Sequence, residues 1–386
     1  MFHSIAMLRL SLTLFCTSYL CLCPVLCSTC IAKSDESVLL ATGDTNGPKQ
    51  PQAAVSSDGV VYAVFGFGED IFVCSSRDSG KSFSNPTVAF RVPNVSLGSR
   101  RGPRITANGD SLIISAIGGK QGKGQDGDLL AWRSNDRGAT WKGPVMVNDT
   151  MDSAREGLHA MAVSSTGDTW CTWLDLRNKR TELYASKSTD GGATWSTNEL
   201  IYRSSEKNIC ECCHPSIVIQ DKTVHMLFRN SIAGNRDMYL TSMTFQGAKF
   251  KANSMRLGNE HWKLNACPMD GGMLTADKNG LVSTIWRRGR EIFISTNDGT
   301  DEQQVGIGEQ PWIASTPSGP VAIWSTRRDG ELKMKRSGTT EMQTIAVNAR
   351  DAVIIAGKNL FVFWEQNENG RSSIFAKTLP LVPSEK

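Results

Sequence analysis

Short apolar runs separated by turn residues, rather than a helical repeat, organise this chain. The runs are rich in Val, Ile, Thr and Trp, and Gly, Asp and Asn lie between them, a pattern typical of short β-strands. The runs group into seven segments that follow one plan. The second run of each segment is, in order, Val60–Phe67, Ser111–Ile117, Thr169–Leu174, Thr223–Phe228, Leu281–Trp286, Pro320–Trp324 and Asn359–Trp364. The pattern predicts an all-β fold.

One short pattern occurs three times, at spacings of about 54–58 residues. It reads Ser-x-Asp-x-Gly-x-Thr/Ser-aromatic and begins at Ser76, Ser134 and Ser188. The Asp accepts backbone N–H bonds across a turn, the Gly allows a positive φ, and the aromatic residue packs the following strand on the sheet. The pattern resembles the Asp box, or BNR repeat, of the sialidase superfamily of β-propellers. This resemblance implies an exported bacterial sialidase-like protein.

The segment plan predicts a β-propeller of four-stranded antiparallel blades. The last segment lacks a fourth run, whereas an unpaired run, Ser37–Thr42, precedes the first segment. We therefore expect this N-terminal strand to complete the last blade and close the ring, which removes exposed strand edges. The count is seven blades, and six blades with one segment as an insertion is the alternative. The seven segments open near Pro51, Gly102, Leu158, His214, Pro268, Pro311 and Asp351.

The N-terminus differs from the rest of the chain. Arg9 precedes a long apolar stretch that ends near Leu26, and small residues follow it. This is the pattern of a secretory signal peptide, here residues 1–32 with cleavage after Ala32, and it leaves a single propeller domain over 33–386. The predicted location is exported: periplasmic, extracellular or at the cell surface. A retained membrane anchor is disfavoured by Pro24, and lipid attachment at Cys30 is disfavoured by the Thr before it.

The formal net charge of +4 is small for this length and gives no reason to expect a nucleic-acid partner. Gly-rich phosphate loops and dinucleotide fingerprints between a strand and a helix are absent from the sequence, which disfavours nucleotide chemistry. We expect a monomer without a retained transmembrane helix.

In a propeller, the loops before the first strands and after the second strands of the blades open on one face, here called the charged face. Several segments place a basic residue there at the same register. This pattern suits an anionic ligand such as an acidic sugar, bound by arginine forks, whereas salt bridges between blades are the alternative. The predicted ligand-binding residues are Arg104, Arg155, Arg177, Arg229, Arg236, Arg287, Arg327 and Trp312.

The resemblance implies sialidase chemistry, which needs an arginine cluster, a Tyr nucleophile assisted by Glu, and an Asp acid. Phe90-Arg-Val-Pro93 is similar to the motif of the family's first arginine, but it follows the first repeat on an outer strand. None of the five tyrosines lies where a nucleophile is expected. A carboxylate pair, Glu156 and Asp175, is the catalytic hypothesis.

Cys210-Glu-Cys-Cys-His-Pro215 opens the fourth segment, and Cys267 lies at the equivalent point of the fifth. In an exported protein, Cys210, Cys212, Cys213 and Cys267 are expected to form two disulfides. The alternative is a soft-metal site that adds His214, His159 or Met269, with copper as the first choice and zinc as the second. Cys74 and Cys171 fall within strands and are predicted to be buried free thiols.

Three functions follow from these patterns. The first is a sialidase-like propeller that cleaves or binds acidic glycans at the charged face. The second is a metal-binding propeller with Cys and His ligands, and the third is a partner-binding propeller without catalysis. The family resemblance favours the first, although a fold alone does not fix a function.

Overall fold

Twenty-seven strands and no helix make up the described part of the chain, residues 37–246, 249–296 and 299–382 of the computed structural model. The predicted signal peptide, with Cys16, Cys21, Cys23, Cys27 and Cys30, lies outside the described residues. Within the described ranges, no helix is long and apolar enough to cross a membrane. The all-β prediction is confirmed.

Twenty of the strands form five separate four-stranded antiparallel sheets, in which consecutive strands are neighbours. The first holds β2 (Lys49–Val55), β3 (Val61–Phe67), β4 (Asp70–Ser76) and β5 (Thr87–Arg91). The second holds β6 (Arg104–Asn108), β7 (Ser111–Gly118), β8 (Asp128–Ser134) and β9 (Lys142–Met146). The third holds β10 (His159–Val163), β11 (Thr169–Asp175), β12 (Glu182–Ser188) and β13 (Glu199–Tyr202). The fourth holds β14 (Ser216–Gln220), β15 (Thr223–Arg229), β16 (Met238–Gln246) and β17 (Lys249–Arg256), and the fifth holds β18 (Met273–Ala276), β19 (Val282–Arg288), β20 (Glu291–Thr296) and β21 (Gln303–Ile307).

The other seven strands form a single sheet in the order β1-β27-β26-β25-β24-β23-β22. Its members are β22 (Glu309–Thr316), β23 (Gly319–Ser325), β24 (Gly330–Arg336), β25 (Met342–Ala356), β26 (Leu360–Glu368), β27 (Arg371–Leu379) and β1 (Val38–Gly43). The long strand β25 pairs with β24 in its first part and with β26 in its second. Five separate blades are therefore present, and the prediction of seven separate four-stranded blades, like the alternative of six, is wrong. Asn348 and Asp351 have positive φ angles of 53° and 49°, so the chain bends there while its pairing continues.

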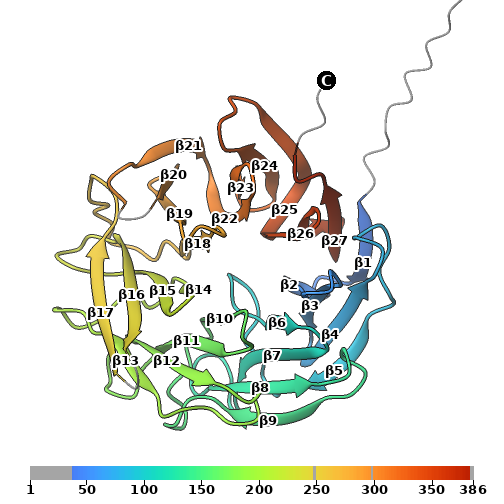
Figure 1. Ribbon diagram of the computed structural model, residues 1–386, viewed down its shortest axis with the longest axis horizontal. Helices are drawn as coiled ribbons and strands as arrows, with labels where there is room; N and C mark the ends of the chain where they lie inside the picture. The colour runs from blue at the N-terminus through green and yellow to red at the C-terminus, as the bar shows by residue number, and fades with distance from the viewer. Residues whose placement is uncertain (1–36, 247–248, 297–298, 383–386) are drawn as a thin grey trace, which may run out of the picture. The chain divides into compact units, whose positions relative to one another are not determined.

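The first strands of the sheets lie around a common centre (Figure 1). Contacts link β2 to β6, β6 to β10, β10 to β14, β14 to β18, β18 to β22, β22 to β25, and β25 back to β2. The N-terminal strand β1 pairs antiparallel with β27, as predicted. Apolar clusters fill the spaces between neighbouring sheets; one joins β7 and β8 to β11 through Ile117, Leu129 and Trp173. The chain thus has the closed arrangement of a β-propeller.

The three repeated segments form the predicted turns between third and fourth strands. In the segment at Ser188, the Asp190 carboxylate accepts hydrogen bonds from the Thr194 N–H at 2.9 Å and from the Ser188 hydroxyl at 2.9 Å. Gly192 has a positive φ of 83° and donates its N–H to the Ser188 oxygen. In the first segment, the aromatic residue Phe83 contacts Phe363 of the seven-stranded sheet edge-on at 5.9 Å. These turns fasten adjacent sheets together.

Candidate functional site

A layer of buried polar side chains lies where the first strands begin. It includes Arg100, His159, His214, Asp270 and Asp351, none more than 2% exposed. Arg100 donates to the carbonyl oxygens of Gln310 and Ala352, at 2.8 and 2.9 Å, and so bridges distant parts of the chain. Its Nε lies 3.9 Å from the Asp351 carboxylate. These bonds support the salt-bridge alternative for Arg100, whereas each of the five side chains also has one buried polar atom without a hydrogen-bond partner.

Several predicted ligand-binding arginines are bound to backbone carbonyl groups. Arg104 is buried and donates to the carbonyl oxygens of Gly102, Pro103 and Arg100. Burial lowers its pKa to about 9, with a further contribution from the Arg100 charge. Arg229, 1% exposed, donates to the carbonyl oxygens of Asp270, Arg236 and Arg287. These two guanidinium groups therefore donate hydrogen bonds to the protein's own backbone.

Arg287 and Trp312 are also engaged within the protein. Arg287 pairs with Asp270 at 3.0 Å and with Glu309 at 3.4 Å, and it lies over the Trp262 ring. The Trp312 ring, 8% exposed, contacts the guanidinium of Arg100 and is stacked with the imidazole of His214. It lines a cavity of about 370 Å³ in the centre of the ring of strands.

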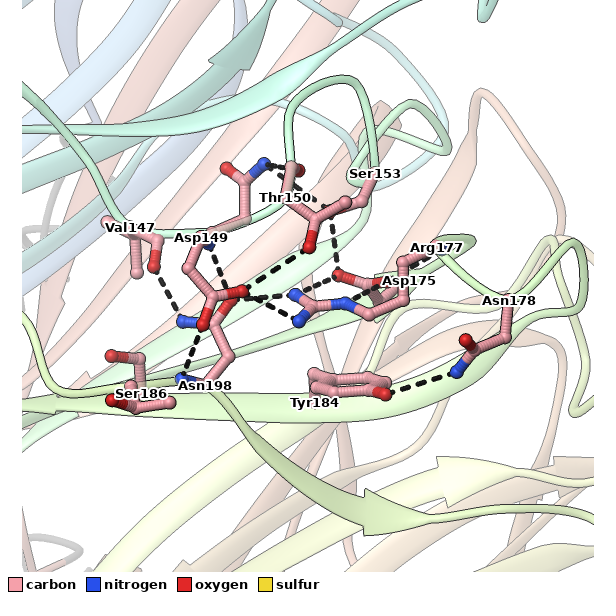
Figure 2. Close-up of polar contacts among 12 residues, drawn as sticks. Val147, Asp149, Thr150, Ser153, Asp175, Arg177, Asn178, Tyr184, Ser186 and Asn198 are labelled. Atoms are coloured by element: carbon pink, nitrogen blue, oxygen red, sulfur yellow. Dashed lines mark hydrogen bonds and ion pairs between the residues drawn. The ribbon is translucent and has the colours of Figure 1, made fainter.

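Asp175 and Arg177 form a cluster of polar contacts on the charged face (Figure 2). Asp175 is fully buried and accepts bonds from Trp173, Ser153 and Arg177, each at 2.7–2.9 Å. Arg177 also pairs with Asp149 at 2.7 Å and lies over the Tyr184 ring at 4.1 Å. Each Asp175 oxygen is therefore occupied, as expected for a carboxylate that positions a loop.

Glu156 lies in a different environment. It is partly buried, and desolvation raises the pKa of its carboxyl, with Arg101 opposing the shift and Glu211 adding to it. Glu156 lines a pocket of about 450 Å³, together with Arg155, Lys179, Arg180 and Glu211. We call this the Arg155 pocket. Arg177 lines it too, whereas Asp175 does not.

The remaining predicted arginines differ in solvent exposure and in ion pairing. Arg155 and Arg327 are exposed. Arg236 pairs with Glu211 at 3.5 Å. Of the predicted site residues, the Arg155 pocket therefore includes the binding residues Arg155 and Arg177 and the catalytic candidate Glu156. Arg327 does not line it.

The tyrosines offer no activated nucleophile within the described residues. Burial raises the pKa of Tyr62, Tyr184, Tyr202 and Tyr239. Tyr184 has a carboxylate nearby, Glu182, but that group is bound by Arg203, Arg180 and Asn178. The geometry thus differs from a Tyr–Glu nucleophile pair, which needs the carboxylate free to take the phenol proton.

Three of the predicted cysteines are gathered in the loop before β14. The sulfur of Cys210 lies 3.6 Å from that of Cys212 and 3.3 Å from that of Cys213, and all three side chains are buried. All six cysteines of the described residues are free thiols. Hydrogen bonds from Cys212 and Cys213 lower the pKa of the Cys210 thiol to about 3, and burial raises the pKa of Cys213. Interaction with Cys212, with a smaller contribution from desolvation, raises the pKa of the exposed Cys267 to about 11.

The two predicted histidine ligands lie apart from the sulfur atoms. His159 hydrogen-bonds the Ser115 hydroxyl through Nε2 at 2.9 Å, and His214 accepts the Gly271 N–H through Nδ1 at 3.3 Å. Desolvation holds the pKa of both imidazoles well below the ordinary value, with nearby arginines adding to the shift. The group of close potential ligands within the described residues consists of Cys210, Cys212 and Cys213 alone. Cys74 and Cys171 are buried free thiols, as predicted.

Sequence reasoning missed several contributors to these sites. Lys179 and Arg180 follow β11 in the loop that carries Arg177, and that loop position was a usable signal. Asp149 and Asn198 join the Arg177 cluster from the ends of outer strands, where no sequence pattern marked them. Arg100 has no sequence signal either, because its carbonyl partners lie more than two hundred residues away.

No model of a known protein family matches the chain, and no curated protein matches its sequence. Solved structures match its fold. A protein of unknown function from Dyadobacter fermentans is 14% identical, with a TM-score of 0.54 over 89% of this chain and 98% of that one. The α-L-arabinanase of Penicillium chrysogenum, complexed with arabinobiose, is 12% identical, with a TM-score of 0.53 over 89% and 97%. A Trypanosoma rangeli sialidase in complex with sialic acid is 14% identical, with a TM-score of 0.47 over 86% and 54%. These likenesses concern the fold alone, and in fold the chain is a β-propeller.

Proposed function

We propose that this chain is an exported, monomeric propeller that binds an acidic glycan in the Arg155 pocket. The observation that carries the proposal is the composition of that pocket, a space of about 450 Å³ in which five basic side chains outnumber the three carboxyl groups of Asp152, Glu156 and Glu211. Arg155, Lys179 and Lys207 are exposed, so their charges are open to a ligand. The arginines bound to carbonyl oxygens elsewhere on the charged face lack this freedom.

The size and charge of the pocket suit one or two sugar rings that carry a carboxylate. Guanidinium and ammonium groups bind carboxylates through charge-assisted hydrogen bonds, and pockets of 300–1,000 Å³ are typical of small-ligand sites. Among the solved structures of similar fold, the arabinanase was solved in complex with the sugar arabinobiose. That likeness concerns fold, and it makes a saccharide a reasonable first ligand class to test.

Glu156 is the proposed acid of the pocket if the glycan is cleaved. A glycosidase acid must keep its proton at neutral pH until it protonates the leaving oxygen, and desolvation favours the protonated form of Glu156. Asp175, the other member of the predicted pair, is a positioning residue here, since it holds Arg177 at the edge of the pocket. Hydrolysis therefore depends on Glu156 rather than on both carboxylates.

Calorimetric titration with sialyllactose, oligogalacturonate and neutral arabinobiose tests the binding proposal. We expect an acidic ligand to bind, and each of the substitutions Arg155→Ala and Lys179→Ala to weaken binding about tenfold, the effect of one charge-assisted hydrogen bond. Arg327→Ala is the matched control, because Arg327 is an exposed arginine outside the pocket. Equal loss in all three variants, or binding of the neutral sugar alone, would refute the pocket assignment.

Glycoside release is a separate measurement on the same protein. If the glycan is cleaved, Glu156→Gln should abolish release while binding of the acidic ligand persists, since the amide keeps the shape of the side chain but donates no proton to the leaving group. Release that survives this substitution would exclude Glu156 as the acid.

A further inference from the structure

We propose that Cys210, Cys212 and Cys213 form a three-sulfur site for a soft metal ion, cuprous copper, at the loop before β14. This proposal stands on a different group of side chains from the glycan pocket, and the same loop contributes Glu211 to that pocket. Its first support is distance. The sulfur atoms lie 3.3 and 3.6 Å apart, with all three within 4.8 Å of one another.

At these separations the sulfur atoms are not joined by a disulfide, which needs them about 2.05 Å apart. Three thiolates around one metal ion at about 2.3 Å have sulfur atoms roughly 4.0 Å from each other, not far from the spacing observed here. The cluster therefore needs only a small adjustment to enclose an ion.

The backbone holds the three side chains in place before any ion binds. The Cys210 N–H donates to the Arg229 carbonyl at 2.9 Å, and the N–H of Ile209 donates to the Thr181 carbonyl at 3.1 Å. On the other side of the cluster, Pro215 leads directly into β14. Because both ends of the short loop are fixed, little conformational entropy is lost on binding.

The surroundings of the sulfur atoms differ from those of ordinary buried thiols. Cys74 belongs to a large apolar core, whereas Cys210, Cys212 and Cys213 form a separate cluster whose one apolar neighbour is the partly buried Met269. Arg229 and Arg236 also act electrostatically on Cys210. A cuprous ion with three thiolates carries a net charge of −2, which Arg229 and Arg236 offset in part, since Arg236 also pairs with Glu211.

The softness of the sulfur ligands and their number indicate which metal the site would bind. Thiolates prefer Cu(I), Zn(II) and iron–sulfur clusters among biological metals, and structural zinc requires four ligands. Three buried sulfurs suit the low coordination number that cuprous copper tolerates. Neither His159 nor His214 belongs to the group of close ligands. Each thiol that binds the ion releases its proton to solvent.

Cys267 has a distinct place at this site. It is exposed and comes from the loop before β18, and it does not belong to the group of close sulfurs. Because its thiol is open to solvent, an incoming ion can reach it directly. We infer that Cys267 assists transfer of the ion and is not required to hold it.

Competition with the chromophoric chelator bicinchoninate measures Cu(I) binding to the full chain under anaerobic conditions. We expect one Cu(I) per chain, and X-ray absorption should count three sulfur neighbours. Cys212→Ser should weaken binding at least about 100-fold. Cys267→Ser should keep the stoichiometry and affinity but slow the exchange of Cu(I) with the chelator. Cys74→Ala is the matched control, because it removes a buried thiol outside the cluster and should leave binding unchanged.

Three results would overturn the proposal. The chain could leave Cu(I) entirely with the chelator, or peptide mapping could find Cys210 joined to Cys213 by a disulfide in protein that had never met the metal. A single Zn(II) with four sulfurs, lost in Cys267→Ser, would replace the cuprous site by a zinc site. If Cys212→Ser fails to fold, the sulfur count by X-ray absorption on the unsubstituted chain still decides.

Discussion

Arg177 binds two carboxylates that differ greatly in burial, so the contribution of each ion pair to the free energy of unfolding can be measured separately. Asp175 is fully buried, whereas the Asp149 side chain is 41% exposed. Arg177→Ala leaves the Asp175 charge buried without its ionic partner, so we expect the free energy of unfolding to fall by about 3–5 kcal/mol. Urea unfolding monitored by tryptophan fluorescence measures the change.

Asp149→Ala provides the matched comparison, since it removes an exposed partner of the same guanidinium. Exposed ion pairs contribute little, and we expect a loss below about 1 kcal/mol. Equal losses in the two variants would show that burial of the Asp175 charge is not what makes the cluster stabilising. An intact Arg155 pocket also depends on Arg177, so Arg177→Ala should weaken glycan binding while Asp149→Ala changes it little.

At the scale of the element, the repeated turns make stability depend on acid pH. Hydrogen bonds from hydroxyl and backbone groups of Ser134 and Thr140 lower the pKa of Asp136 to about 2, and those from Thr194 lower that of Asp190 to about 2. Unfolded, both carboxyls titrate near 3.8. Their stabilising contribution is therefore complete above that pH and is lost as the pH falls through about 2.

Asp190→Asn tests this dependence with little change of shape. The urea midpoint of the variant should lie below that of the unsubstituted chain at pH 5, and the two should converge near pH 2. Glu341→Gln, at an exposed position outside the repeated turns, is the control. A difference between the Asp190 variant and the unsubstituted chain that stays constant from pH 5 to pH 2 would contradict the interpretation.

Elements with a local pattern were predictable, and those defined by distant contacts were not. The run Thr169–Leu174 became β11, and the Asp-x-Gly turns formed because their hydrogen bonds lie within a few residues. The seventh segment was expected to open as a separate blade near Asp351, whereas β25 runs through that point as one strand. Its pairing with β24 and then with β26 joins the two segments in one sheet. The cysteines of one loop were found from the sequence, but the carbonyl partners of Arg229 come from other sheets and leave no sequence trace.

At the scale of the whole propeller, closure of the ring depends on β1. This strand pairs with β27, and among residues 37–382, as far as the structure describes them, no other strand pairing joins the two ends. Adjacent leucines of β1 face opposite ways: Leu40 is 7% exposed and belongs to the core of the seven-stranded sheet, whereas Leu39 is 52% exposed. Substitution of each leucine in turn therefore distinguishes the contribution of the packed face of β1 from that of its exposed face.

Leu40→Ala should lower the free energy of unfolding by about 2–4 kcal/mol, because it leaves a cavity beside the closing strand. Leu39→Ala should change it by less than about 0.5 kcal/mol. If β1 closes the propeller as one cooperative unit, the Leu40 variant melts at a lower temperature in a single transition. Amide hydrogens of β27 should then exchange faster only in step with those of β26. A separate early transition, with β27 exchanging ahead of every other strand, would instead show that β1 frays independently and that the remaining sheets hold together without it.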